Sequence, residues 1–253
     1  MLLELNEVSK SFGGVAALTG VSFGVKQGEV FGVIGPNGAG KTTLFNLITG
    51  VFPASSGEIV FDGMSVVGIK PHRTVEMGIA RTFQNIRLFK DLTVLDNVLI
   101  AFSNHHKQHV LASFLRLPAF YKNEEELKSK ALDLLKIFDL DGDANTLAKN
   151  LAYGQQRRLE IVRALATEPK ILFLDEPAAG MNPQETAELT ELIRRIKDEF
   201  KITIMLIEHD MNLVMEVTER IYVLEYGRLI AHGTPDEIKN NKRVIEAYLG
   251  GEA

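Results

Sequence analysis

One stretch of the sequence has glycines, a lysine and a threonine at the spacing of a phosphate-binding loop. It reads Gly35, Pro36, Asn37, Gly38, Ala39, Gly40, Lys41 and Thr42, which fits the pattern G-x-x-x-x-G-K-[ST]. The glycines allow backbone N–H groups to converge on phosphate oxygens. We expect Lys41 to reach the β- and γ-phosphates, Thr42 to ligate Mg²⁺ and Thr43 to add a phosphate contact. The stretch predicts a site for ATP and Mg²⁺ but leaves the function open.

Two acids end an apolar run further along the chain. Asp175 and Glu176 follow residues 171–174, and a buried strand delivers such acids to the edge of the sheet where ligands bind. Asp175 is suited to hold Mg²⁺, and Glu176 to polarise an attacking water. Taken alone, the pair could equally be two solvated acids in a loop. The phosphate-binding loop favours the first interpretation, because Mg²⁺ needs an acidic partner.

These residues need a sheet and helices to position them. The runs 30–35, 171–175 and 202–209 are apolar without alternation, which is typical of strands buried on both faces of a parallel sheet. Helix-like segments follow, one at 42–50 and one after Asn182, and Thr234 to Glu237 resembles the capping box of a further helix. Between about 85 and 165 the strand signals fade, and 123–138 is an amphipathic helix that we expect Asn123 to cap. The pattern predicts an α/β fold with a mostly parallel sheet and a helical insertion.

The overall composition excludes several classes of protein. The 253 residues carry a net charge of −5, which weighs against nucleic acid as the main partner. The absence of cysteine excludes disulfides, thiolate metal sites and thiol catalysis. Glu4 and Glu7 interrupt any signal-peptide core, and Arg116 and Pro118 break the apolar stretch 110–120. We therefore expect a cytoplasmic chain that can still sit on a membrane protein.

Further segments follow in the order found in the ATP-binding cassette (ABC) ATPases, which the chain resembles over nearly its whole length. They are Phe12 with Val15 at the adenine position, Gln84 at the Q-loop, Leu151, Ala152, Tyr153, Gly154 and Gln155 at the signature, Ala179 to Asn182 at the D-loop and His209 at the switch histidine. The resemblance implies that Phe12 stacks on adenine and that the signature contacts nucleotide. It also implies catalytic roles for Glu176, His209 and Gln84, with Gln84 as a further Mg²⁺ ligand.

Two departures from the family pattern affect these expectations. Ala152 replaces the signature serine, so no hydroxyl is available for a γ-phosphate, and Tyr153 replaces a glycine. Gly154 and the backbone can still supply donors. At the D-loop, Asn182 stands where the family has an acid; it either does the work of that acid or only caps the next helix.

The resemblance implies a P-loop NTPase fold in a single nucleotide-binding domain, residues 1–253. Residues 1–84 and 165–253 would form the core together with an antiparallel β subdomain, and 85–164 the helical subdomain. Two such subunits, as a homodimer or a related heterodimer, would enclose two ATP molecules. They would dock on transmembrane permease subunits at the cytoplasmic face of the membrane, served by an extracytoplasmic solute-binding protein.

Several segments resemble the ATP-binding subunits of branched-chain amino-acid importers, the LivG type. They are 11–18, 35–50, 78–89, 151–161 and 176–183. The expected function is thus the ATPase motor of such an importer. The alternatives are the ATPase of another ABC transporter, with a different solute or in lipopolysaccharide-type export, and a soluble ABC ATPase acting on nucleic acid or ribosomes. Acidic composition and the lack of a second cassette oppose the last.

The stretch 103–120 has no clear role. His105 and His109 would share a helix face, but no third metal ligand is visible. Its apolar residues fit either a local core or a surface that faces the permease.

Overall fold

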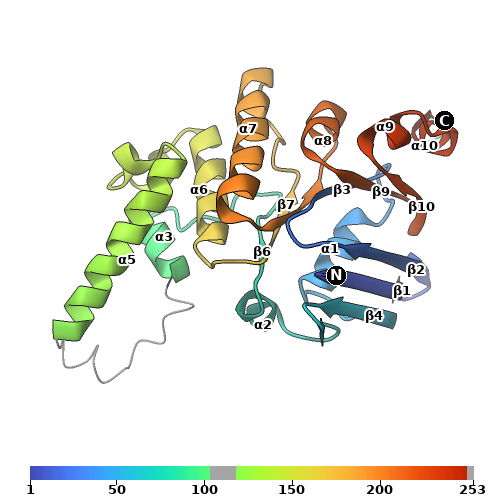
Figure 1. Ribbon diagram of the computed structural model, residues 1–253, viewed down its shortest axis with the longest axis horizontal. Helices are drawn as coiled ribbons and strands as arrows, with labels where there is room; N and C mark the ends of the chain where they lie inside the picture. Colours follow the sequence, from blue (N-terminus) through green and yellow to red (C-terminus); the bar gives the residue numbers. More distant parts are fainter. Residues whose placement is uncertain (103–117, 250–253) are drawn as a thin grey trace. The chain divides into compact units, whose positions relative to one another are not determined.

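The structure is a computed structural model that describes residues 1–102 and 118–249 (Figure 1). The chain divides into two compact units, Met1–Arg81 with Lys170–Ala253 and Thr82–Pro169. His105, His109 and most of the stretch 103–120 lie outside the described residues.

A six-stranded sheet forms the centre of the first unit. Its strand order is β10-β9-β3-β8-β7-β6, and all neighbours run parallel except β10 with β9. The strands are β3 (Val30–Ile34), β6 (Ile79–Arg81), β7 (Ile171–Asp175), β8 (Thr203–Ile207), β9 (Arg220–Glu225) and β10 (Arg228–Gly233). Every residue of β3, β7 and β8 is buried, as their apolar runs predicted. Strand β6 was not predicted, because a three-residue strand carries no periodicity.

A second, antiparallel sheet belongs to the same unit. Its order is β2-β1-β4-β5, with β1 (Leu3–Phe12), β2 (Val15–Val25), β4 (Ser56–Phe61) and β5 (Met64–Ser65). One continuous apolar core joins this sheet to helix α1 (Lys41–Ile48) and to one face of the six-stranded sheet. Phe45 of α1 meets Phe173 of β7 edge to face, with ring centroids 5.2 Å apart. Helix α1 is thereby fixed at the carboxyl end of β3.

Five more helices belong to the described part of the first unit, and two of them confirm the predicted caps. They are α2 (Pro71–Glu76), α7 (Pro183–Phe200), α8 (Met211–Val217), α9 (Pro235–Lys239) and α10 (Lys242–Leu249). Asn182 Oδ1 accepts the N–H groups of Gln184 and Glu185 at 2.9 and 3.0 Å, so it caps α7. Thr234 and Glu237 form the expected capping box of α9. In Figure 1, α7 and α8 lie on the face of the six-stranded sheet away from α1.

The second unit is helical in its described part. It contains α3 (Val94–Phe102), α5 (Pro118–Ile137), α6 (Tyr153–Leu165) and two short 3₁₀ turns, Asp141–Asp143 and Ala148–Asn150. Helix α5 begins at Pro118, so the expected cap at Asn123 is wrong: proline is well suited to the first turn, and the helix simply starts earlier. Among the described residues, no helix is long and apolar enough to cross a membrane.

Candidate functional site

The phosphate-binding loop connects β3 to α1 through backbone that only glycine tolerates. Gly35 and Gly40 have φ of 150° and 101°. A Cβ on Gly35 would lie 2.0 Å from the Leu224 carbonyl oxygen, and one on Gly40 would lie 2.7 Å from that of Ala17. Neighbouring backbone therefore lies too close to Gly35 and Gly40 for any side chain at either position. The loop ends at the N-terminus of α1, where backbone N–H groups are available to an anion.

Lys41 begins α1 and curls back over the loop. Its Nζ donates to the carbonyl oxygens of Gly35 at 2.7 Å and Pro36 at 3.0 Å. Burial lowers the pKa of this ammonium, and the nearby charges of Glu176 and Asp175 oppose that change. A buried ammonium that donates to neutral carbonyl oxygens is matched to a ligand that brings negative charge of its own.

A hollow of about 230 Å³ opens over this loop. It is lined by Ala17, Asn37, Gly38, Ala39, Gly40, Lys41, Thr42, Thr43, Glu176 and His209. The structure therefore brings the loop, the second acid and the histidine predicted from the sequence around one space. Gly35 and Pro36 lie at the base of the loop, and Asp175 is buried at the end of β7.

Glu176 and His209 face each other in this hollow. The distance from His209 Nε2 to Glu176 Oε1 is 2.9 Å, and the histidine side chain is 49% exposed while the glutamate side chain is 18% exposed. Glu176 adopts a left-handed φ of 48°, and its N–H donates to the Ile207 carbonyl at 2.8 Å. The turn after β7 is thereby fastened to β8, the strand that precedes His209.

Glu208 is a buried residue that sequence reasoning missed. One carboxylate oxygen accepts the Ala178 N–H at 2.7 Å, and the other accepts those of His209 at 2.8 Å and Asp210 at 3.3 Å. This side chain joins the loop after Glu176 to the loop bearing His209. The available signal was an acid directly before a functional histidine in the sequence. The hydrogen-bond partners of Glu208 could not be predicted from residue spacing.

The donors available for a magnesium ion are the Thr42 hydroxyl and the Asp175 carboxylate. Mg²⁺ usually takes one or two protein ligands and completes its shell with phosphate and water oxygens, so this small hard-oxygen set fits it. Arg81 lies 4.0 Å from Asp175, stacks 4.5 Å from the Phe45 ring and bonds Asn46 and Thr49 at 3.0 Å each. The sequence did not single out Arg81, because its partners come from α1 and β7.

The residues expected at the adenine lie on the antiparallel sheet. Phe12 ends β1 and Val15 begins β2, and both are exposed. The Phe12 ring meets Phe52 edge to face at 5.3 Å, and Lys10 Nζ lies 4.9 Å from its centroid. The contact with Phe52, which was not predicted, therefore supports the Phe12 ring, and the ring remains accessible to a planar ligand.

Gln84 and the signature segment belong to the second unit. Ala152 stands at the N-cap of α6, where its methyl group accepts no hydrogen bond; Gln155 Oε1 accepts the Ala152 N–H at 3.1 Å, and Gln155 Nε2 donates to Asp143 at 2.9 Å. Tyr153 is exposed, and Gly154 lies in the first turn. The N-terminus of α6 therefore has no side-chain cap from Ala152, such as a serine hydroxyl would provide.

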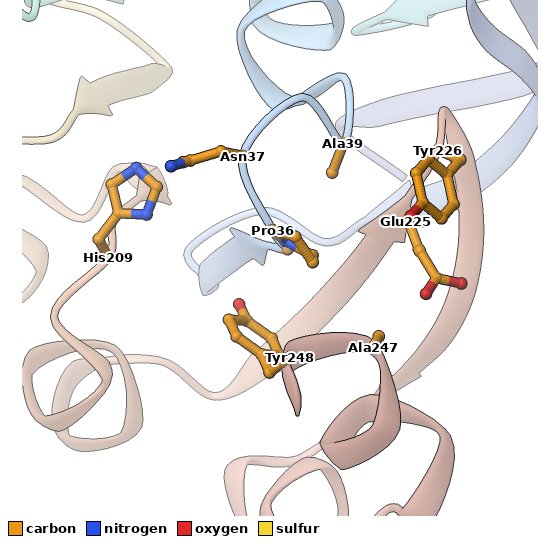
Figure 2. A pocket seen from close by; sticks show the side chains of 9 residues that line it. Pro36, Asn37, Ala39, His209, Glu225, Tyr226, Ala247 and Tyr248 are labelled. Atoms are coloured by element: carbon orange, nitrogen blue, oxygen red, sulfur yellow. The ribbon is translucent and has the colours of Figure 1, made fainter. Parts of the chain in front are cut away.

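A second hollow, about 340 Å³, lies beside the loop (Figure 2). It is lined by Gly35, Pro36, Asn37, Ala39, His209, Glu225, Tyr226, Ala247 and Tyr248. Figure 2 shows the Tyr248 hydroxyl, carried by α10, directed toward Pro36. Burial raises the pKa of Tyr248, and a hydrogen bond from the Gly35 backbone opposes the change. The C-terminal helix therefore contacts the phosphate-binding loop, which sequence reasoning did not anticipate.

Comparison with known proteins identifies the class to which this fold and loop belong. The family described as "ABC transporter" matches residues 18–179, and the chain belongs to that family. It is therefore an ATP-hydrolysing subunit of a transport system, which confirms the expected fold class and activity. A second family, described as "Branched-chain amino acid ATP-binding cassette transporter", matches residues 228–253.

Relatives with high identity point to one branch of the family. The chain is 46% identical, over 98% of both chains, to the high-affinity branched-chain amino acid transport ATP-binding protein BraF of Pseudomonas aeruginosa. The same figures hold for LivG of Salmonella typhimurium. Among solved structures, the ADP conformation of MJ1267, an ATP-binding cassette of an ABC transporter, matches with a TM-score of 0.84 and 33% identity over 98% of both chains. The resemblance to the LivG type is confirmed.

Proposed function

We propose that this chain is the ATPase motor of an importer for branched-chain amino acids. The observation that carries the proposal is the placement of Glu176 and His209, in mutual contact, in the hollow above Lys41 and the phosphate-binding loop. The choice of solute is supported by the relatives, whose names specify branched-chain amino acids.

In this proposal the chain's own groups divide the work of hydrolysis. The loop 35–43 binds the triphosphate, and Lys41 exchanges the carbonyls of Gly35 and Pro36 for phosphate oxygens. Glu176 accepts a proton from the attacking water. His209 Nε2, at 2.9 Å, keeps the Glu176 carboxylate oriented and adds a hydrogen bond near the γ-phosphate. Phe12 and Val15 receive the adenine.

Mg²⁺ would be held by Thr42 and Asp175, with Gln84 as a further ligand, and would neutralise charge on the transferred phosphoryl group. Gly154, Gln155 and the backbone of Ala152 and Tyr153 would contact the nucleotide of a second ATPase subunit. The exposure of Ala152 and Tyr153 supports this assignment. The same family relationship supports a single nucleotide-binding domain. It also supports docking on permease subunits at the cytoplasmic face of the membrane, with an extracytoplasmic solute-binding protein delivering the amino acid.

The Glu176→Gln variant tests the catalytic assignment. It keeps the shape of the side chain but removes the proton acceptor, so we expect Mg-ATP to bind with near wild-type affinity while phosphate release falls at least a hundredfold. ATP should also trap the variant as a dimer, measured by light scattering. Unchanged turnover would refute Glu176 as the base. Uptake of labelled leucine by the reconstituted transporter, against labelled lysine as control, tests the solute.

A further inference from the structure

The loop that carries Gln84 is held by a buried arginine of the signature helix. Arg157, one turn into α6, is 0% exposed. Its Nη1 donates to the Phe83 carbonyl oxygen at 2.7 Å, and its Nη2 donates to that of Gln84 at 2.9 Å. One guanidinium therefore binds two consecutive peptide groups, one on each side of the Gln84 Cα atom.

Glu160, one turn further along α6, completes the arrangement. Its Oε2 accepts Arg157 Nη1 at 3.0 Å, and its Oε1 accepts the backbone N–H groups of Phe83 at 3.3 Å and Arg87 at 3.1 Å. The pair thus binds donors and acceptors of the same loop. Its two buried charges compensate each other, and the loop provides hydrogen-bond partners for both Nη atoms of Arg157, while the buried Nε atom has none among the described residues.

Two further side chains fasten the far end of the loop. Arg163 of α6 donates to the Arg87 carbonyl, and its guanidinium lies 4.7 Å from the Phe89 ring. Asn97 of α3, fully buried, accepts the Phe89 N–H and donates to the Phe89 carbonyl, both at 3.0 Å. Irregular backbone between Phe83 and Phe89 is therefore fixed by helices rather than by a sheet.

We propose that Arg157 and Glu160 make the Gln84 loop and the signature helix one rigid body, so that any displacement of Gln84 also moves residues 151–155. The proposal rests on the proposed function for the roles of Gln84 and the signature. Arg157 and Glu160 are positioning residues: they act through the backbone of the loop and are not placed at the reacting atoms.

Distance measurements by pulsed EPR test the rigidity directly, because the chain has no cysteine and two introduced ones are the only labelling sites. Asn85→Cys and Asn150→Cys place spin labels on exposed residues, one beside Gln84 and one just before the signature. We expect a narrow distance distribution that is the same without and with Mg-ATP. In Arg157→Gln the distribution should broaden or shift. A narrow, unchanged distribution in that variant would overturn the proposal.

Kinetics of the full chain separate positioning from simple stabilisation. Arg157→Gln should lower kcat ten- to hundredfold, the size expected when groups near the chemistry are misplaced by about 1 Å. KM for ATP should stay within about twofold, because the phosphate-binding loop belongs to the other unit. Arg157→Lys, which keeps the charge and one of the two carbonyl bonds, should recover part of kcat. A kcat for folded Arg157→Gln within about twofold of wild type would contradict the positioning role.

Two controls keep the test decisive. Arg73→Gln removes an exposed arginine that pairs with Glu76 on α2 and should leave kcat unchanged. If Arg157→Gln does not fold, Glu160→Gln replaces it. This variant keeps the side-chain volume, but its amide accepts through one oxygen only, so it should lose either the bonds from the Phe83 and Arg87 N–H groups or the bond from Arg157, and it should give the same broadening. Absence of any turnover in the wild-type chain would refute the proposed function instead, while the distance measurement would still decide the rigidity.

Discussion

His209 Nε2 lies 2.9 Å from Glu176 Oε1, although the two residues come from turns that follow different strands. The contact exists because β7 and β8 are parallel neighbours in register, with Asp175 opposite Ile207. The carboxyl ends of both strands therefore meet at one edge of the sheet. A histidine and an acid separated by 33 positions are thereby brought into direct side-chain contact.

Replacing His209 by alanine should lower kcat about a hundredfold or more, because the hydrogen bond to Glu176 and the donor facing the phosphate both disappear. KM for ATP should change little, since Lys41 and the loop remain. Steady-state phosphate release measures both constants. His72→Ala, on the exposed face of α2, is the matched control. Equal losses in both variants would show that the effect is not local.

Replacing Glu208 by glutamine should lower kcat about tenfold while the chain stays folded. An amide accepts through one atom only, so either the Ala178 N–H or those of His209 and Asp210 meet a donor instead. The free energy of unfolding should also fall by about 1–3 kcal/mol, the cost of a buried group left without a hydrogen-bond partner, and thermal unfolding measures this loss. Glu191→Gln, at an exposed ion pair on α7, should change neither quantity. A normal kcat would mean that Glu208 serves stability alone.

Two glycine-to-alanine changes separate backbone strain from crowding. Gly35→Ala would place a Cβ 2.0 Å from the Leu224 carbonyl oxygen, so the loop must move and ATP affinity should fall at least tenfold. Gly63→Ala, at φ of 76° with open space around it, should cost only the strain of about 1–2 kcal/mol and leave affinity intact. Urea unfolding and calorimetric ATP titration compare the two. Similar ATP affinities would argue against the close approach to Leu224.

The stability of the chain should depend on the ionisation of Glu160. Burial raises its pKa, against the opposing effects of hydrogen bonds from the Arg87 and Phe83 backbones and of the Arg157 charge; Arg163 also faces it. Between the ordinary value of 4.5 and the raised pKa, the folded chain holds more protons than the unfolded one. The stability that Glu160 contributes is therefore fully present below pH 4.5 and is lost as pH rises through the raised pKa.

Glu160→Gln should remove this pH-dependent contribution, so the unfolding free energy of the variant should vary less with pH than that of the wild-type chain. Urea unfolding at several pH values from 4.5 to neutrality measures the difference. Glu125→Gln, at an exposed position on α5, is the control and should keep the wild-type slope. A wild-type slope in Glu160→Gln would assign the pH dependence to another group.

Local pattern predicted much of this fold. The runs that became β3, β7 and β8 are buried on both faces and therefore carry a strong apolar signal. The caps at Asn182 and Thr234 depend only on nearest neighbours, and both were found. The phosphate-binding loop was visible because one continuous segment contains it.

What the sequence did not predict depends on contacts between distant segments. Arg81 meets Asp175, Phe52 meets Phe12 and Tyr248 meets Gly35, and no local spacing contains these pairs. Arg157 reads locally as a charged helix residue, which is ordinarily solvated. Only the fold places it at the backbone of the Gln84 loop.

The position of β3 in the sheet has a consequence for how the chain is made. Its two neighbours, β8 and β9, are formed by residues 203–207 and 220–225, so this early strand has no partner in its sheet until most of the chain has left the ribosome. Until then, an apolar strand and the loop after it remain open to aggregation, and the long-range pairing makes folding slow. Chaperone dependence during synthesis should therefore be concentrated on the N-terminal third of the chain, and truncated chains that end before β8 should be recovered as aggregates.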